Sequence, residues 1–207
     1  MAVENLIHIN NQDKASTLNQ AGDKLGTYYL AQNPKYYEPQ RSNTFMFYIE
    51  GLSNALEIPQ NTYAQANAEE VLMLSVQKAF VPNRKVNALE LKRGNNTMKF
   101  AGTLVSESGS LTLNDFIGAG TKDVMYAWLQ KAYDDRTEKV GLQGDYKKDG
   151  YVIEYTPDYQ VVRTWKLYGC WCNEVTFGEV SHGDATLLTM NATIQYDKAV
   201  LDTSDIA

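Results

Sequence analysis

Few residues of this 207-residue chain combine the types and spacing that catalysis or metal binding requires. An activated nucleophile needs a histidine close to a serine, cysteine or threonine, and the chain has two histidines. His8 lies near the N-terminus, and His182 lies in a Ser-His-Gly-Asp turn. Neither is surrounded by the cysteines, histidines or clustered carboxylates that usually form a metal site. We therefore expect no catalytic residue, no cofactor site and no metal site.

The cysteines, carboxylates and glycines support the same expectation. Cys170 and Cys172 are one residue apart, so a strand places both thiols on one face, where we expect them reduced and partly buried rather than paired. Asp134 and Asp135 are adjacent and diverge at the end of a predicted helix. The segment FIGAGTKD precedes that helix, but it lacks the GxxxxGK[ST] spacing of a phosphate-binding loop.

Charge and hydropathy argue against several further classes of protein. The net charge is −6 and the pI is about 5.0, which argues against duplex-DNA binding, because that binding requires Lys and Arg to neutralise phosphates. No apolar run is long enough to cross a bilayer. The N-terminal MAVENLIHINNQDK lacks the basic and apolar regions of a secretory signal. We expect no membrane insertion.

Alternation of apolar and polar residues predicts the elements that position these groups. In Thr186–Tyr196 every second residue from Leu188 onward is apolar, the pattern of a half-buried strand. In a second run, Trp165, Leu167, Gly169 and Trp171 alternate with Thr164, Lys166, Tyr168 and Cys170. The residues that these patterns predict for the core are Trp165, Leu167, Leu188, Met190 and Ile194.

Other strands and one helix follow from local pattern. A hairpin is predicted from Ala88–Arg93 and Thr97–Val105 across the turn Gly94-Asn95-Asn96. A helix is predicted over Lys122–Tyr133, with Thr121 as N-cap and an apolar stripe of Val124, Trp128 and Ala132 that packs on the sheet. The remaining predicted strands are Thr44–Glu50, Val71–Phe80, Lys139–Gln143 paired with Tyr151–Tyr155, Val161–Tyr168 and Val175–Val180.

These elements predict a mainly β fold, a β-barrel or sandwich with one flanking α-helix. Residues 1–42 are predicted as an extended N-terminal arm with weak strands at Leu6–Ile9 and Thr27–Leu30, and residues 43–207 as a single barrel domain. Ser53–Ala68 is polar and is predicted as a long loop. Loops of this length in compact domains are usually functional or disordered.

Five segments in order resemble the tail tube protein of contractile bacteriophages and related injection machines. They are the aromatic strand Phe45–Gly51 with Leu52, the L-x-L-K-R-G strand and turn Leu89–Gly94, the helix AWLQKAYD around Trp128, the W-x-L-x-G strand Arg163–Gly169, and the last alternating strand ending in Gln195-Tyr196-Asp197. Together they span residues 45–197.

The resemblance implies a non-enzymatic structural virion protein. It implies a tube-type β-barrel that forms hexameric rings, stacked helically into the hollow inner tube of a contractile tail. The implied partners are other copies of the chain, the tail sheath, the baseplate and tape-measure proteins, with DNA passing through the lumen without specific binding. The implied location is the virion tail, assembled in the host cytoplasm.

The resemblance also places contacts between rings in the long loop and next to it. The residues implied there are Ser53, Asn54, Pro59, Tyr63 and Glu69. The acidic excess of the chain then suggests a lumen that repels DNA phosphates.

Three alternatives remain open. The first is a carbohydrate- or protein-binding β-sandwich module of a virion surface, with Tyr36-Tyr37 and Trp171 as an exposed aromatic patch. The second is an enzyme with a carboxylate pair from distant positions. The third is the inner tube of a secretion machine or a tube cap.

Overall fold

A computed structural model of the chain describes residues 39–56, 67–118, 120–183 and 185–202. The weak strands predicted at Leu6–Ile9 and Thr27–Leu30, and Tyr36-Tyr37, lie outside the described residues. The chain divides into two units, Met1–Arg41 and Ser42–Ala207, and the description below concerns the second.

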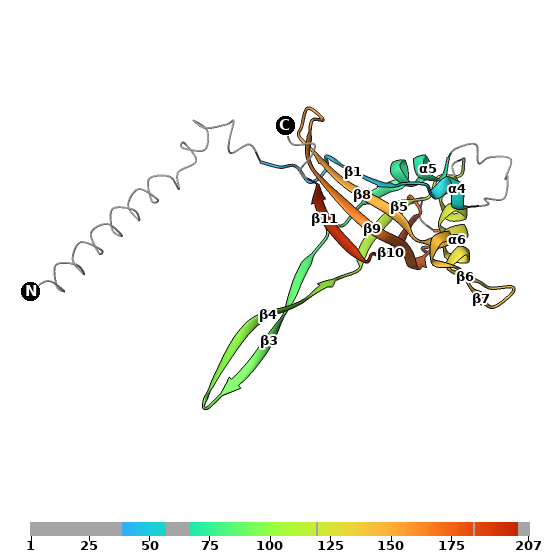
Figure 1. Ribbon diagram of the computed structural model, residues 1–207. Coiled ribbons are helices and arrows are strands. Elements are labelled where there is room, and N and C mark those ends of the chain that lie inside the picture. Colours follow the sequence, from blue (N-terminus) through green and yellow to red (C-terminus); the bar gives the residue numbers. More distant parts are fainter. Residues whose placement is uncertain (1–38, 57–66, 119, 184, 203–207) are drawn as a thin grey trace, which may run out of the picture. The chain divides into compact units, whose positions relative to one another are not determined.

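The second unit is built on a strongly curved antiparallel sheet, which confirms the predicted mainly β fold (Figure 1). The strand order is β1-β8-β9-β10-β5-β2, and β11 pairs with β9. The sheet is nearly closed, as in a barrel. Its strands are β1 (Phe45–Ile49), β2 (Val76–Lys78), β5 (Gly109–Asn114), β8 (Lys148–Tyr155), β9 (Val161–Thr176), β10 (Thr189–Gln195) and β11 (Lys198–Asp202).

The longest strand, β9, holds the sheet together and changes face in the middle. Its first half pairs with β8 and β11, and its second half pairs with β10. Leu167 lies opposite Gly150, whereas Cys170 lies opposite Lys148, so β9 has one extra residue at this point. Gly169 has φ +65° and supplies the left-handed backbone of this bulge.

The bulge makes part of the predicted alternation wrong. Beyond Leu167 the buried residues are Cys170 and Cys172, and Trp171 is only partly buried. An inserted residue shifts the following side chains to the other face, because successive side chains of a strand alternate. The two thiols therefore share a face, as predicted, but they are fully buried rather than partly buried.

The helix α6 (Thr121–Ala132) packs on the sheet and α5 (Ala68–Ser75) lies beside it (Figure 1). The predicted N-cap is wrong, because Gly120, with φ +64°, occupies that position without a side-chain cap. Thr121 is instead buried, and its hydroxyl is 2.9 Å from the hydroxyl of Ser75. This hydrogen bond satisfies two polar groups inside the core.

Half of the strand predicted over Val71–Phe80 is helix. Its first five residues belong to α5, and only Val76–Lys78 form a strand. Glu69 and Glu70 lie in the first turn, where they complement the helix dipole, and Leu, Met and Ala are good helix formers. A short apolar run does not distinguish a buried strand from a buried helix by its periodicity.

Four other elements differ from the prediction. Lys139–Val140 (β7) pairs with Tyr133–Asp134 (β6) rather than with Tyr151–Tyr155, and the helix α7 (Gln143–Tyr146) follows it. The strand predicted over Val175–Val180 ends at Thr176, and the strand predicted over Thr186–Tyr196 corresponds to β10, which begins at Thr189. The short helix α4 (Leu52–Ala55) lies in the segment predicted as a loop.

Candidate functional site

The predicted hairpin is confirmed and is longer than predicted. Its strands are β3 (Arg84–Arg93) and β4 (Asn96–Ser106), and it extends away from the sheet (Figure 1). Every residue of β3 is exposed, and within the described part of the chain β3 and β4 pair only with each other. An isolated two-stranded hairpin is marginally stable in water, so a surface that covers it would stabilise it.

One face of this hairpin is apolar. Leu89 lies opposite Phe100, and Leu91 lies opposite Met98. Because strand side chains alternate, these four residues share a face. Their exposed fractions are 61% and 50% for the first pair and 53% and 50% for the second. Exposed apolar patches of this kind mark interaction sites, and the L-x-L spacing is the sequence signal that could have identified the face.

The hairpin is basic although the chain is acidic. Between residues 84 and 106 there are five cations and one anion, whereas the whole chain has a net charge of −6. The Glu90 carboxylate lies 3.5 Å from the Lys99 ammonium on the face opposite Leu89 and Leu91. The hairpin therefore carries an apolar face and a charged face, with positive charge that favours an acidic partner surface.

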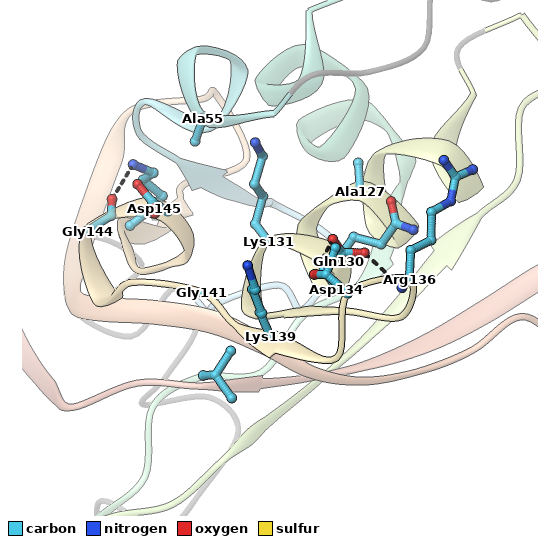
Figure 2. Close-up of a pocket in the computed structure, with 13 residues that line it drawn as sticks. Ala55, Ala127, Gln130, Lys131, Asp134, Arg136, Lys139, Gly141, Gly144 and Asp145 are labelled. Carbon is cyan, nitrogen blue, oxygen red and sulfur yellow. Dashed lines mark hydrogen bonds between the residues drawn. The ribbon is translucent and has the colours of Figure 1, made fainter.

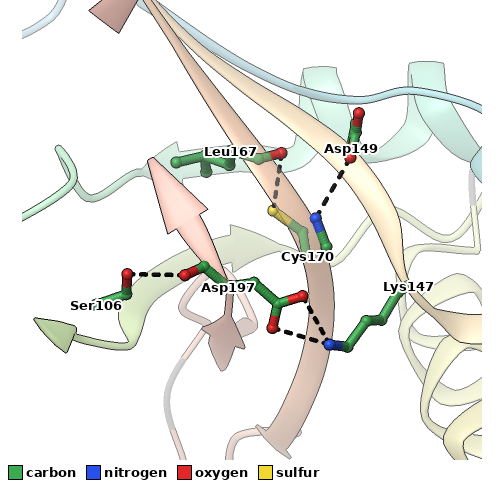
Figure 3. Close-up of polar contacts among 7 residues, drawn as sticks. Ser106, Lys147, Asp149, Leu167, Cys170 and Asp197 are labelled. Atoms are coloured by element: carbon green, nitrogen blue, oxygen red, sulfur yellow. Dashed lines mark hydrogen bonds and ion pairs between the residues drawn. The ribbon is translucent and has the colours of Figure 1, made fainter. Parts of the chain in front are cut away.

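Polar contacts tie the base of the hairpin to the sheet (Figure 3). The Ser106 hydroxyl donates to the Asp197 carbonyl at 3.0 Å, and the Lys147 ammonium lies 2.7 Å from the nearer Asp197 carboxylate oxygen. The Gly169 N–H donates to the Asp149 carboxylate at 3.3 Å. The Ser106 hydrogen bond joins the base of the hairpin to Asp197, and the other two contacts lie next to it at the β9 bulge.

A polar cleft of about 930 Å³ lies between α4, α6, α7 and the β6–β7 turn. Four cations line it, Lys131, Arg136, Lys139 and Lys148, together with two carboxylates. Figure 2 shows the Lys131 and Lys139 side chains extending in the same direction. Among the described residues, Lys131, Arg136 and Lys139 form no ion pair within 4 Å.

The cleft carboxylate Asp134 is bound by its own turn. The Arg136 N–H donates to one carboxylate oxygen at 3.0 Å, and the Thr137 hydroxyl donates to the other at 2.8 Å. These hydrogen bonds, the backbone one first, lower the pKa of Asp134. Asp134 thus orders the β6–β7 turn and keeps its charge at neutral pH. The cleft is net positive and is suited to binding an anionic group.

The residues predicted to contact other rings lie near α4 and α5 or outside the described residues. The Ser53 hydroxyl donates to the Asn67 side chain at 3.0 Å and accepts from the Glu69 N–H at 3.5 Å. Asn54 lies in α4. Pro59 and Tyr63 lie outside the described residues. The structure therefore joins the two ends of the predicted loop through Ser53.

The residues predicted for the helix stripe and the core lie as follows. Val124 and Trp128 are buried, Ala132 is partly buried, and the Trp128 indole N–H donates to the Tyr146 carbonyl at 2.9 Å. The predicted core residues Leu167, Met190 and Ile194 are fully buried, and Trp165 and Leu188 are partly buried.

Among the residues that the structure describes, the groups that could do chemistry are dispersed or inert. Among the described residues no three His, Cys, Asp or Glu side chains are grouped to hold a metal ion. Burial, with smaller effects of nearby charges, raises the pKa of Cys170 and of Cys172 to about 12, so both are neutral thiols. His182 is exposed. Trp171, considered for an aromatic patch, is partly buried and lies edge-on to Tyr146.

No helix in the described ranges is long and apolar enough to span a membrane.

Comparison with known proteins gives a family match. The family model described as T4-like virus tail tube protein gp19 matches residues 43–200. Comparison with curated protein sequences finds no match.

Solved structures share the fold. A chain of the extended PVC sheath-tube complex, an extracellular contractile injection system, has a TM-score of 0.56 and 15% identity, covering 83% of this chain and 96% of that one. A chain of the extended PVC sheath/tube terminator has a TM-score of 0.55 and 15% identity, with coverage of 80% and 97%. A chain of the anti-feeding prophage baseplate has a TM-score of 0.55 and 12% identity, with coverage of 79% and 95%.

Proposed function

This chain belongs to the T4-like virus tail tube protein family, and from that premise we propose that it polymerises as stacked hexameric rings into the hollow inner tube of a contractile tail. In this role it is a structural protein and not an enzyme. The family match covers the barrel unit, so we propose residues 43–207 as the tube domain and residues 1–42 as an added arm.

The apolar face of the β3–β4 hairpin carries this proposal. Leu89, Leu91, Met98 and Phe100 are each at least half exposed, and the hairpin lacks support from other strands within the described residues. Burying the exposed half of such a side chain stabilises by roughly 1 kcal/mol. Four of them, repeated at each contact of a ring, supply a substantial driving force for association. A neighbouring copy is therefore the surface that we propose covers this face.

A contact of this type supports the proposed assembly into rings. The hairpin of one copy and the surface that receives it are different patches, so the contact is heterologous. Heterologous contacts close into rings when their rotation closes, and otherwise propagate as helical assemblies. The basic hairpin also favours the acidic remainder of a second copy over another hairpin.

The proposed tube conducts DNA and is enclosed by a sheath attached to a baseplate. The similarity to chains of sheath-tube, terminator and baseplate structures supports these partners, and a tape-measure protein would set the tube length. The net charge of −6 supports a lumen that repels phosphates. Ser53, Asn54, Pro59, Tyr63 and Glu69 remain the proposed contacts between rings.

Negative-stain electron microscopy of the concentrated protein tests this function. Wild-type protein should form rings or hollow tubes with six-fold symmetry. The variant Leu89→Ser/Phe100→Ser should stay monomeric, because it removes one cross-strand pair of the apolar face. The matched control Glu90→Ser/Lys99→Ser removes the neighbouring pair on the opposite face and should still assemble. Discrete monomers from wild-type protein at all concentrations, or normal tubes from the apolar-face variant, would contradict the proposal.

A further inference from the structure

The basic cleft and a hairpin turn that carries one carboxylate, Asp158, lie at opposite ends of the same strand. Strand β8 begins at Lys148, which lines the cleft, and ends at Tyr155, just before the β8–β9 turn. Eight residues of strand separate the two features by roughly 26 Å. Figure 1 shows this turn at the end of the sheet remote from α6.

The β8–β9 turn is an exposed tip that is held by hydrogen bonds within the turn. The Thr156 and Gln160 backbones are joined by a 2.8 Å hydrogen bond, and the Tyr159 N–H donates to the Thr156 carbonyl at 3.0 Å. The Thr156 hydroxyl donates to the Asp158 carboxylate. Asp158 is exposed, and Tyr159 is 76% exposed with φ +62°. A bulky residue rarely adopts this backbone conformation, and such strain is concentrated at functional contacts.

The cleft has the opposite charge and a size that admits this tip. Lys131, Arg136 and Lys139 are without an ion pair among the residues that the structure describes, and the cleft volume is about 930 Å³. Ala127 and Val140 add an apolar part to its lining. A carboxylate next to an aromatic ring matches this combination, because a cation attracts both a carboxylate and the face of a ring.

We propose that the Asp158–Tyr159 tip of one copy docks in the basic cleft of the next copy along the tube axis. This inference rests on the proposed tube function and assigns a contact between its stacked rings. The Asp158 carboxylate binds the Lys131 and Lys139 ammonium groups, and the Tyr159 ring packs against Arg136 and Val140. The hydrogen bonds within the turn restrict its conformation before docking, which lowers the entropy lost on binding.

The position of the two features favours a second copy of the chain as the occupant. A tip at one end of a subunit and its complementary cleft at the other end form a head-to-tail contact. A contact of this kind does not close between two copies and extends in one direction. The cleft is also lined by Ala55 of α4, next to the segment proposed to contact neighbouring rings. Both contacts would then serve the same ring boundary.

A charge-swap experiment tests the docking. Asp158→Lys, and separately Lys131→Glu/Lys139→Glu, should each lower the fraction of rings that stack by about tenfold, because like charges face each other across the boundary. Combining the three changes restores opposite charges and should restore stacking. Glu179→Lys and Lys78→Glu, at exposed positions outside the tip and cleft, are the matched controls. Single rings and tubes are counted by electron microscopy, and circular dichroism checks each fold.

The outcomes separate this inference from the proposed function. Normal rings with poor stacking in both partial variants, and stacking restored in the combined variant, would support the docking. Normal tubes in both partial variants would overturn the docking and leave the tube function intact. A combined variant that folds but stacks no better than the partial variants would also overturn it. Absence of rings and tubes from wild-type protein would overturn the tube function and this inference with it.

Discussion

The same Leu-x-Leu pattern occurs in the sheet and in the hairpin, with opposite environments. Leu111 and Leu113 of β5 have no exposed surface, whereas Leu89 and Leu91 of β3 are 61% and 53% exposed. Strand β5 lies between β10 and β2 and contacts α5, while β3 has only β4 as a partner among the described strands. The pattern therefore predicts an apolar face in both places, but it does not predict whether the same chain or another chain covers that face.

Matched leucine substitutions should give the largest difference between the two regions. Leu113→Ala should lower the free energy of unfolding of the isolated subunit by about 2–5 kcal/mol, because it removes buried methyl groups and leaves a cavity. Leu91→Ala should change it by less than about 0.5 kcal/mol, since surface substitutions rarely exceed this value. Urea unfolding below the concentration of assembly measures both.

The order of the two substitutions should be reversed in an assembly assay, when the concentration needed for assembly is compared at equal amounts of folded protein. Leu91→Ala should raise the concentration needed for assembly several-fold, because it removes area that a neighbour buries. Leu113→Ala, assayed at a temperature where it remains folded, should assemble at nearly the wild-type concentration. Equal unfolding losses at both sites would show that the hairpin is covered within its own subunit, and would remove the contrast.

A feature could be predicted from the sequence where the residues that determine it are neighbours along the chain. The hairpin could be predicted because Gly94-Asn95-Asn96 and the flanking alternation are adjacent in sequence. The side of the sheet on which the Cys170 side chain lies could not be predicted, because the bulge at Gly169 depends on pairing with β8. The basic cleft was also missed, because its lysines and arginine converge from α6 and the β6–β7 turn only after folding.

The helix α5 shows a second limit. Its sequence, AEEVLMLS, is an apolar run that fits a strand as well as a helix. Tertiary packing decides between helix and strand here. Val71, Leu72 and Ser75 are all buried, and the Ser75 hydroxyl is hydrogen-bonded to the Thr121 hydroxyl. The family resemblance, which does not depend on these details, was confirmed by the match over residues 43–200.

Two glycines at strand irregularities offer the next comparison. Gly169→Ala should destabilise the subunit by about 1–2 kcal/mol, because φ is +65° and a Cβ atom would meet the Asp197 carboxylate. In the hairpin, a Cβ atom on Gly102 would lie 2.7 Å from the Asn87 carbonyl oxygen. Gly102→Ala should therefore distort the hairpin and weaken assembly while leaving the unfolding midpoint of the sheet almost unchanged.

Thermal unfolding and the concentration for assembly, measured on both glycine variants, check this pair. If Gly102→Ala lowers the midpoint of thermal unfolding as much as Gly169→Ala does, the hairpin and the sheet unfold as one unit. That result would argue against independent coverage of the hairpin.

The buried thiols of β9 should make the stability of the sheet fall at alkaline pH. Burial raises the pKa of Cys172 from 9.0 to about 12, so its stabilising effect is complete below pH 9 and is lost as the pH rises toward 12. At pH 10 this thiol alone should lower the free energy of unfolding by about 1.4 kcal/mol relative to pH 8. The variant Cys172→Val lacks the ionisable group. Between pH 8 and pH 10 its free energy of unfolding should therefore fall by about 1.4 kcal/mol less than that of the wild-type protein. Denaturant titrations at the two pH values measure the difference, and parallel losses in both proteins would refute it.

The smallest expected difference concerns one ion pair from each region. Lys147 is 20% exposed, and its ammonium contacts both carboxylate oxygens of Asp197, whereas Lys99 is 69% exposed and lies 3.5 Å from Glu90. Exposed pairs contribute little, because water screens them and long side chains lose entropy. Lys147→Met should cost about 0.5–1 kcal/mol in unfolding free energy, and Lys99→Met should fall near zero. In 1 M NaCl the Lys147→Met loss should shrink. A larger loss at Lys99 than at Lys147 in the isolated subunit would mean that the hairpin already has a folded partner within its own chain.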